Sequence, residues 1–258
     1  MGEITKADLL AILEHIWLTK NETASRVRGR IETVLDYAKA KEYLEGDNPA
    51  AWKGMLKPLL PMPSKVQNKK HHAALPYGEL GAFMAELRTR TGVSARALEF
   101  SILTVARSGE IRGAEWSEID LAAKTWIIPA ERMKASKEHR VPLSDAAVAL
   151  LKMLPRFKGN NLVFPAPRGG QLSDMSLTAV LKRMGRSDLT QHGFRSTFRE
   201  WAGETTSYQR EVIENALAHQ LADKAEAAYQ RGTLWPKRVA LMDDWTDYCG
   251  YEPLDKAA

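Results

Sequence analysis

The stretch from 191 to 195 reads Gln-His-Gly-Phe-Arg, and the rest of the chain can be interpreted outward from it. Its histidine and arginine are three positions apart, so at a helix N-terminus both stand beside backbone N–H groups that attract an anion. His219 and Tyr229 follow downstream, and Arg107 lies far upstream in Ala-Arg-Ser-Gly-Glu. Two guanidinium groups, two imidazoles and a phenol can together clamp, protonate and attack one phosphate.

Each of these residues also has an ordinary structural interpretation. Arg107 can form an ion pair with Glu110 after a tight turn at Gly109, and Glu110 can equally orient its guanidinium. His192 can cap a helix, and Tyr229 can be a half-buried aromatic. The nearby Arg112 and Arg199 are best explained by surface or ion-pair roles.

Composition excludes several classes of protein. A chain of 258 residues with 44% hydrophobic and 27% charged residues forms one large or two modest domains rather than a disordered segment. The 37 Lys+Arg against 32 Asp+Glu give a net charge of +5, which favours a polyanionic partner without requiring one. The single cysteine, Cys249, rules out an intramolecular disulfide. Without a membrane-length apolar run or a signal peptide at its start, the chain is expected to be cytoplasmic.

Hydrophobic periodicity predicts two domains joined by a linker. The first is helical, with helices over 8–17, 21–38 and 52–60. The linker lacks apolar periodicity and is rich in cations; its adjacent His71 and His72 have no carboxylate or thiol nearby, so no metal is expected there. The predicted boundaries are 1–61 for the helical domain, which is expected to be incomplete, 62–75 for the linker and 76–258 for the second domain.

The second domain mixes helices with a few short strands. The strands form an antiparallel hairpin, and an amphipathic tail ends the chain. The expected helices are 78–90, 94–106, 144–154, 176–184, 194–202, 208–218 and 222–230, and the expected strands are 125–128 and 139–143. The fold class is therefore mainly α with a small antiparallel β-sheet, an α+β arrangement.

Taken together, several segments resemble one family, the tyrosine recombinases of the phage and prophage integrase branch. The segments are 104–120, 131–134 ahead of 139–144, 191–195, 217–219 and 228–229. The resemblance covers nearly the whole chain, because residues up to 61 look like the end of the helical core-site-binding domain of that branch. It implies a helical DNA-binding domain followed by a tyrosine recombinase catalytic domain.

The resemblance implies a role for each matched residue. Tyr229 attacks the scissile phosphate, forming a 3′-phosphotyrosyl link and releasing a 5′-hydroxyl, with His192 as general base. Arg107 and Arg195 hold the non-bridging oxygens. His219 hydrogen-bonds the phosphate or positions the tyrosine.

The resemblance matches Lys134 to the general acid that protonates the leaving oxygen. Lys137 lies in the same turn, and sequence spacing does not decide between the two ammonium groups. No cofactor or metal is expected, because the phosphotyrosyl link itself conserves the energy of the phosphodiester.

The expected partner is double-stranded DNA carrying attachment or core sites. A homotetramer assembles on DNA in this branch, while a monomer in free solution is compatible with the sequence. The apolar stripe of the tail either packs in cis or docks onto a neighbouring protomer, and both possibilities stay open. The proposed phosphate contacts are Lys20, Arg26 and Arg30, with Lys65, Lys69 and Lys70 of the linker. For the first three, a merely solvated helix face is the alternative.

Three other functions compete with recombination. A type IB topoisomerase uses nearly the same site to relax DNA, and a two-site recombination assay separates the two activities. A DNA-binding regulator with a retired active site is a second alternative, although all six matched positions keep competent side chains. A basic helical module that binds DNA nonspecifically accounts for the charge but not for the ordered set of residues.

Overall fold

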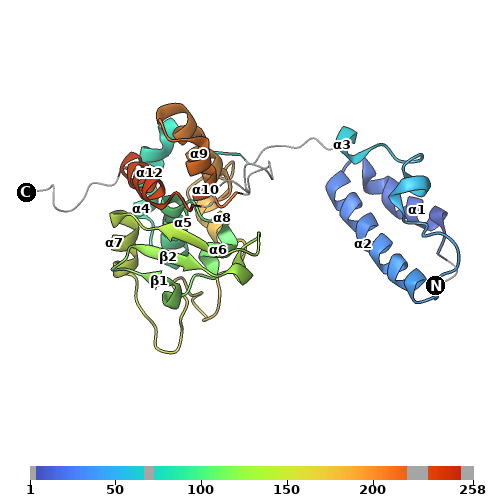
Figure 1. Ribbon diagram of the computed structural model, residues 1–258, viewed down its shortest axis with the longest axis horizontal. Coiled ribbons are helices and arrows are strands. Elements are labelled where there is room, and N and C mark those ends of the chain that lie inside the picture. Colours follow the sequence, from blue (N-terminus) through green and yellow to red (C-terminus); the bar gives the residue numbers. More distant parts are fainter. Residues whose placement is uncertain (1–3, 67–72, 220–231, 251–258) are drawn as a thin grey trace, which may run out of the picture. The chain divides into compact units, whose positions relative to one another are not determined.

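The computed structural model describes residues 4–66, 73–219 and 232–250. The chain divides into two compact units, Met1–His71 and His72–Ala258 (Figure 1). Among the described residues, no helix is both long and apolar enough to cross a membrane.

The first unit is built on two helices, α1 (Lys6–Trp17) and α2 (Asn21–Ala40), which pack against each other. A capping box begins α1: the Thr5 side chain accepts from the backbone of Asp8, whose carboxylate accepts from the backbone N–H of Thr5 at 2.8 Å. Buried residues of both helices and of the following segment form two small cores: Leu9, Leu35, Ala38, Leu44 and Ala50, and Leu13, Trp17, Ala24, Leu56 and Leu60.

The prediction of a helix over 52–60 is wrong beyond a single turn. Only Trp52–Leu56 forms a short π-type turn, and within it Lys53 and Gly54 leave helical geometry, Gly54 with φ of +82°. Trp52 is held instead by stacking on Trp17, with ring centroids 5.7 Å apart. The chain then forms one further turn of helix, α3 (Pro63–Val66).

The second unit surrounds one central helix, α5 (Val93–Thr104), in which nearly every residue is buried. The other helices of this unit, within the described residues, are α4 (Leu80–Thr89), α6 (Ser108–Arg112), α7 (Asp145–Met153), α8 (Ser176–Arg183), α9 (Gly193–Thr205), α10 (Arg210–Ala216) and α12 (Trp235–Tyr248). Of these, α4, α7, α8 and α12 pack against α5. Figure 1 shows the sheet and α7 in the lower half of this unit and α9, α10 and α12 in the upper half.

The sheet has three antiparallel strands in the order β1-β2-β3: Ile119–Asp120, Thr125–Ile128 and His139–Pro142. Strands β2 and β3 form the expected hairpin, in which Trp126 pairs with Val141 and Ile128 with His139. Short 3₁₀ turns lie at Tyr77–Glu79, Trp116–Glu118 and Ala130–Arg132. The predicted fold class, mainly α with a small antiparallel sheet, is confirmed.

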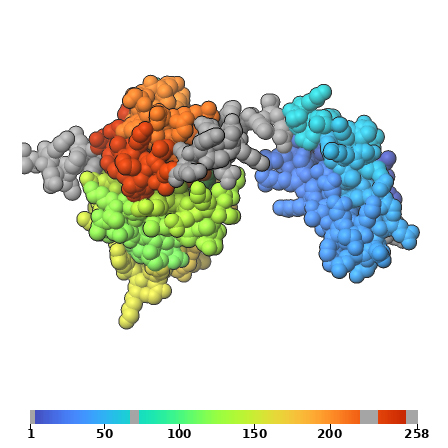
Figure 2. All heavy atoms as spheres, viewed as in Figure 1, coloured from blue at the N-terminus to red at the C-terminus, as the bar shows by residue number. Residues whose placement is uncertain are grey.

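The amphipathic tail, as far as residue 250, packs in cis. Leu241 and Met242 of α12 are buried, and the indole N–H of Trp245 donates to the Ile102 carbonyl of α5 at 2.8 Å. In the space-filling view the red atoms of α12 lie flush against the neighbouring parts of the same unit (Figure 2). The apolar stripe of this helix is thus used inside the unit, and Cys249 at its end is buried as well.

Candidate active site

The segment Gln-His-Gly-Phe-Arg forms the start of α9, with His192 at the N-cap. Thr190 supports this start, since its hydroxyl oxygen accepts from the backbone N–H of Gly193 at 3.0 Å. The buried Gln191 donates from its side-chain amide to the Ala106 carbonyl at 2.9 Å. Ala106 lies 85 residues upstream, so that bond joins the helix start to the turn that carries Arg107.

Gly193 is required because another part of the chain crosses the helix start. A Cβ atom at this position would lie 2.0 Å from the carbonyl oxygen of Ala73 and 3.0 Å from the Cα of Ala74. Thr197, one turn further, donates its hydroxyl to the Leu75 carbonyl at 2.6 Å. The backbone of residues 73–75 therefore packs directly onto the first turns of α9.

Arg195 is a buried cation held by backbone carbonyls rather than by an acid. Its side chain donates to the Val105 carbonyl and, at 2.6 Å, to the Leu217 carbonyl. Only 4% of the residue is exposed, and its Nε has no hydrogen-bond partner among the described residues. Burial, with the nearby charge of Arg107, lowers the pKa of Arg195 to about 10, so the group stays protonated at neutral pH.

Arg107 reaches the same turn from the N-cap of α6. It donates to the Glu110 carboxylate at 2.8 Å and to the Ala218 carbonyl at 3.1 Å. Glu110 also accepts from the backbone N–H of Arg107 at 2.7 Å, so one carboxylate both caps the start of α6 and binds the guanidinium. Glu110 thus orients the arginine and is its ion-pair partner at once, so the two interpretations of this pair describe one contact.

Two of the carbonyl acceptors belong to residues with left-handed backbone. Val105, which ends α5, has φ of +49°, and so does Ala218. A β-branched residue with positive φ is a rare and costly conformation. In both places the turn directs a carbonyl oxygen at one of the two arginines.

His219 completes this cluster. Its Nδ1 lies 2.6 Å from a carboxylate oxygen of Glu214, and its Nε2 lies 3.3 Å from a terminal nitrogen of Arg195. Burial lowers the pKa of His219, and the hydrogen bond to Glu214 offsets part of that effect. Burial alone raises the pKa of Glu214, but hydrogen bonds from His219 and Arg199 outweigh it, so the net shift is downward.

A further histidine, His139 of β3, lies close to this cluster. Burial lowers its pKa most, and the positive charges of Arg238 and Arg107 lower it further, to about 3. A hydrogen bond with the Ala216 backbone raises the pKa and offsets only part of this shift. The imidazole is therefore neutral at physiological pH. Sequence alone assigns no role to His139 or to Glu214, although both contact the turn over 216–219.

Lys134 lies in an exposed turn between β2 and β3, closed by a 2.9 Å hydrogen bond from the Ser136 N–H to the Met133 carbonyl. Lys137 follows in the same connection and is also exposed. Neither ammonium group makes a hydrogen bond or ion pair with any described residue. The turn is anchored next to the cluster because Arg132 donates to the Glu118 carboxylate and to the Glu110 carbonyl.

The structure thus brings three of the predicted residues into one bonded cluster, Arg107, Arg195 and His219. His192 is exposed at the N-cap of the helix that carries Arg195, and Lys134 stands apart in its turn. Tyr229, Lys69 and Lys70 lie outside the described residues. Of the two arginines set aside, Arg199 forms its expected ion pair, with Glu214 at 2.7 Å, and Arg112 donates to the Leu172 carbonyl at 2.9 Å.

In the first unit the proposed phosphate contacts differ in their surroundings. Lys20, Arg30 and Lys65 are exposed and make no side-chain hydrogen bond or ion pair with the described residues. Arg26 forms an ion pair with Glu22, but both side chains are mostly exposed. Such a pair contributes little to stability, so Arg26 is free to exchange its partner.

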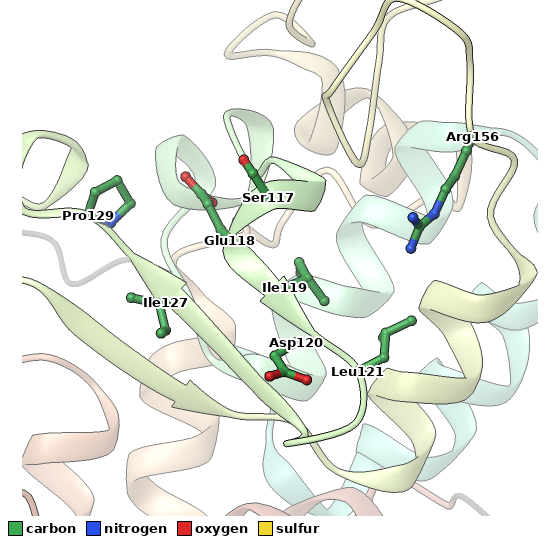
Figure 3. A pocket seen from close by; sticks show the side chains of 8 residues that line it. All are labelled: Ser117, Glu118, Ile119, Asp120, Leu121, Ile127, Pro129 and Arg156. Atoms are coloured by element: carbon green, nitrogen blue, oxygen red, sulfur yellow. The ribbon is translucent and has the colours of Figure 1, made fainter.

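A hollow of about 630 Å³ lies elsewhere, beside the edge of the sheet. Figure 3 shows the eight residues that line it: Ser117, Glu118, Ile119, Asp120, Leu121, Ile127, Pro129 and Arg156. None of these is a predicted site residue. Within the described parts of the chain, no group of three or more His, Cys, Asp or Glu residues could hold a metal ion.

Comparisons with known proteins identify the family of the chain. Residues 1–55 match the phage integrase central domain, and residues 75–231 match the phage integrase family. The integrase of Enterobacteria phage P4 is 29% identical over 250 residues, covering 89% of this chain and 55% of that protein. Prophage integrase IntZ of Escherichia coli K12 is 34% identical over 253 residues, covering 95% and 60%. The chain therefore spans a little more than half the length of these relatives.

Solved structures share the fold. A lambda integrase dimer bound to a COC′ core site has a TM-score of 0.61 at 17% identity, covering 90% of this chain and 81% of that one. A lambda integrase tetramer bound to a Holliday junction has a TM-score of 0.63 at 16% identity, covering 87% and 66%. At such identities the likeness supports the architecture and not the assignment of individual residues.

Proposed function

The chain belongs to the phage integrase family, and from this premise we propose that it is a site-specific DNA recombinase for the integration or excision of a prophage or mobile element. It cleaves and rejoins strands through a 3′-phosphotyrosyl intermediate. The observation that carries the proposal is Arg195, a cation that is only 4% exposed, bonded to carbonyls and not to an acid, and adjacent to Arg107. Such a pair of guanidinium groups is best compensated by a phosphate.

In the proposed reaction the Tyr229 phenol oxygen bonds to phosphorus while the bond to the 5′-oxygen breaks. His192 accepts the phenol proton, which an unperturbed tyrosine with a pKa near 10 would otherwise keep at neutral pH. Lys134, or Lys137 of the same turn, gives a proton to the leaving oxygen. Arg107 and Arg195 stabilise the negative charge on the non-bridging oxygens, and His219 stands beside them.

Rejoining reverses these steps on the 5′-hydroxyl of another strand. Because the phosphotyrosyl link replaces one phosphodiester by another of similar energy, no nucleotide or other cofactor enters. The proposed partner is double-stranded DNA, and the proposed assembly is a homotetramer on two sites, by analogy with the lambda integrase tetramer on a Holliday junction. Acting on DNA in this way, the protein is proposed to be cytoplasmic.

The test is capture of the covalent intermediate from a pool of nicked duplexes with a randomised core, so that the enzyme itself selects its attachment sequence. Denatured adducts are recovered, the DNA is sequenced, and the peptide is mapped. We expect an adduct at Tyr229 that is absent in Tyr229→Phe. DNA binding without any adduct would favour a retired regulator, and supercoil relaxation without exchange between two sites would favour the topoisomerase alternative.

A further inference from the structure

Glu214 is a buried carboxylate of α10, only 8% exposed, that no role in the proposed reaction requires. One of its oxygens lies 2.6 Å from Nδ1 of His219, and the other accepts from Nε of Arg199 at 2.7 Å. Arg199 belongs to α9, the helix that also carries Arg195. The four side chains form a continuous line, Arg199, Glu214, His219 and Arg195.

The chemistry of the two neighbours fixes the proton of His219. An ionised carboxylate only accepts hydrogen bonds, so Nδ1 of His219 must carry the proton. A guanidinium only donates, so Nε2, 3.3 Å from Arg195, must offer its lone pair. Both contacts require the same neutral form, with Nδ1 protonated. A cationic imidazole would instead point an N–H at the N–H of Arg195.

We propose that Glu214 is a positioning residue, which fixes His219 in the Nδ1–H tautomer and thereby orients the Arg195 guanidinium. The inference rests on the proposed function and deepens it, because it states how the phosphate-binding arginine is held before DNA arrives. Among the described residues, the charged groups facing His219 are Glu214 from α10, Arg195 from α9 and Arg107 from the N-cap of α6. Arg199 acts on the imidazole only through Glu214.

The variant Glu214→Gln separates this role from simple packing. The amide has one acceptor oxygen and one donor NH₂, yet it faces two donors, Arg199 and His219. If the oxygen stays with the charged Arg199, the NH₂ faces Nδ1 and forces the proton onto Nε2. The Nε2–H of His219 then faces an N–H of Arg195, and because two donors cannot bond to each other, the guanidinium loses its orientation.

The first readout uses the free protein and is independent of DNA. Nitrogen-15 NMR of histidine side chains, with the His219 signals assigned by their loss in His219→Gln, reports which ring nitrogen is protonated. We expect Nδ1–H in the wild type and Nε2–H in Glu214→Gln. An Nε2–H tautomer in the wild-type protein overturns the proposal, and so does an unchanged tautomer in the variant.

The second readout is the rate of covalent adduct formation on a duplex that the wild type cleaves. We expect Glu214→Gln to slow cleavage by roughly 10- to 100-fold, by analogy with the loss of carboxylates that orient metal-bound histidines, with DNA affinity changed less than about twofold. In the double variant Glu214→Gln/Arg199→Leu the amide oxygen can turn to His219. The Nδ1–H tautomer and part of the rate should return, a rescue that a packing defect would not give.

Glu99→Gln is the matched control, because Glu99 is a buried carboxylate outside the cluster that forms ion pairs with two arginines, Arg88 and Arg96. It should lower stability comparably and leave the rate per folded molecule unchanged. Equal rates of adduct formation for Glu214→Gln and the wild type would contradict the positioning role without contradicting the proposed function. A wild type that forms no adduct defeats the proposed function, and the NMR result then decides the tautomer by itself.

Discussion

Protonation of His139 should make the free energy of unfolding of the protein depend on pH. Its pKa is lowered by burial and by the charges of Arg238 and Arg107 to about 3, whereas in the unfolded chain it is near 6.5. Below pH 6.5 the unfolded state therefore binds a proton at His139 that the folded state does not bind. The folded state loses stability as pH falls from 6.5 towards 3, by up to about 1.4 kcal/mol per pH unit.

Between pH 7 and pH 5 this effect amounts to about 2 kcal/mol at most. We expect the free energy of unfolding, measured in urea at both pH values, to fall by that much more in the wild type than in His139→Gln. The shift of His219 has the same sign but is present in both proteins, so it cancels. Identical pH dependence in the two proteins would mean that His139 titrates normally.

Helix α9 offers a test of how tightly the candidate site is packed. In Gly193→Ala the new Cβ meets the backbone of Ala73 and Ala74, which cannot move aside as a side chain would. We expect a loss of roughly 1–3 kcal/mol in unfolding free energy, the usual cost of overpacking, together with slower cleavage because the start of α9 carries His192 and Arg195. Urea denaturation and the adduct assay measure the two effects.

The same helix provides the control. Gly203 is an exposed residue of α9 with open space around its would-be Cβ. Alanine has a better helix propensity than glycine, so Gly203→Ala should be neutral or stabilise by up to about 1 kcal/mol. Equal effects at both positions would contradict the close crossing at Gly193.

Long elements are predictable from sequence because their apolar spacing repeats. The predicted bounds of helices α1, α2, α4, α5 and α9 and of the β2–β3 hairpin lie within a few residues of the actual ones. Short elements lack that repetition. The sequence indicates only that Gly109 permits a tight turn, whereas the structure places Gly109 inside the one-turn helix α6. The glutamate three residues after Arg107 is the available signal, because a Glu at this position can accept from the backbone N–H at the helix start, as Glu110 does.

The partnership of Glu214 and His219 cannot be predicted from their spacing, because five residues apart is not a helical contact. It arises from the way α10 ends. Ala218 adopts the left-handed conformation, and the N–H of His219 bonds back to the Glu214 carbonyl at 3.0 Å, a Schellman arrangement. The chain reverses there and returns the imidazole to the carboxylate. Glycine is the usual residue at such a position, and alanine gives no sequence signal for it.

At the scale of the whole molecule, each unit has its own buried core and its own part in the proposed function. The bonded cluster belongs to the second unit, whereas the exposed cations of α2 belong to the first. If the first unit tracks the DNA backbone, each lost phosphate contact lowers the slope of log K against log salt by about 0.9. Arg30→Gln should therefore reduce the slope of log K against log salt by about that amount, as measured by fluorescence anisotropy across a salt series. The variant should not change the stability of the fold.

Arg28 on the same helix makes the comparison specific. Its guanidinium donates to the Glu32 carboxylate at 2.6 Å and to the Ala50 carbonyl at 3.0 Å, and its side chain is 17% exposed. Arg28→Gln removes the same formal charge, yet it should weaken the fold and leave the salt slope unchanged, because those bonds keep Arg28 from phosphates. Equal slopes for Arg30→Gln and the wild type would show that this face of α2 is merely solvated. Equal reductions in both variants would point to net charge rather than to specific contacts.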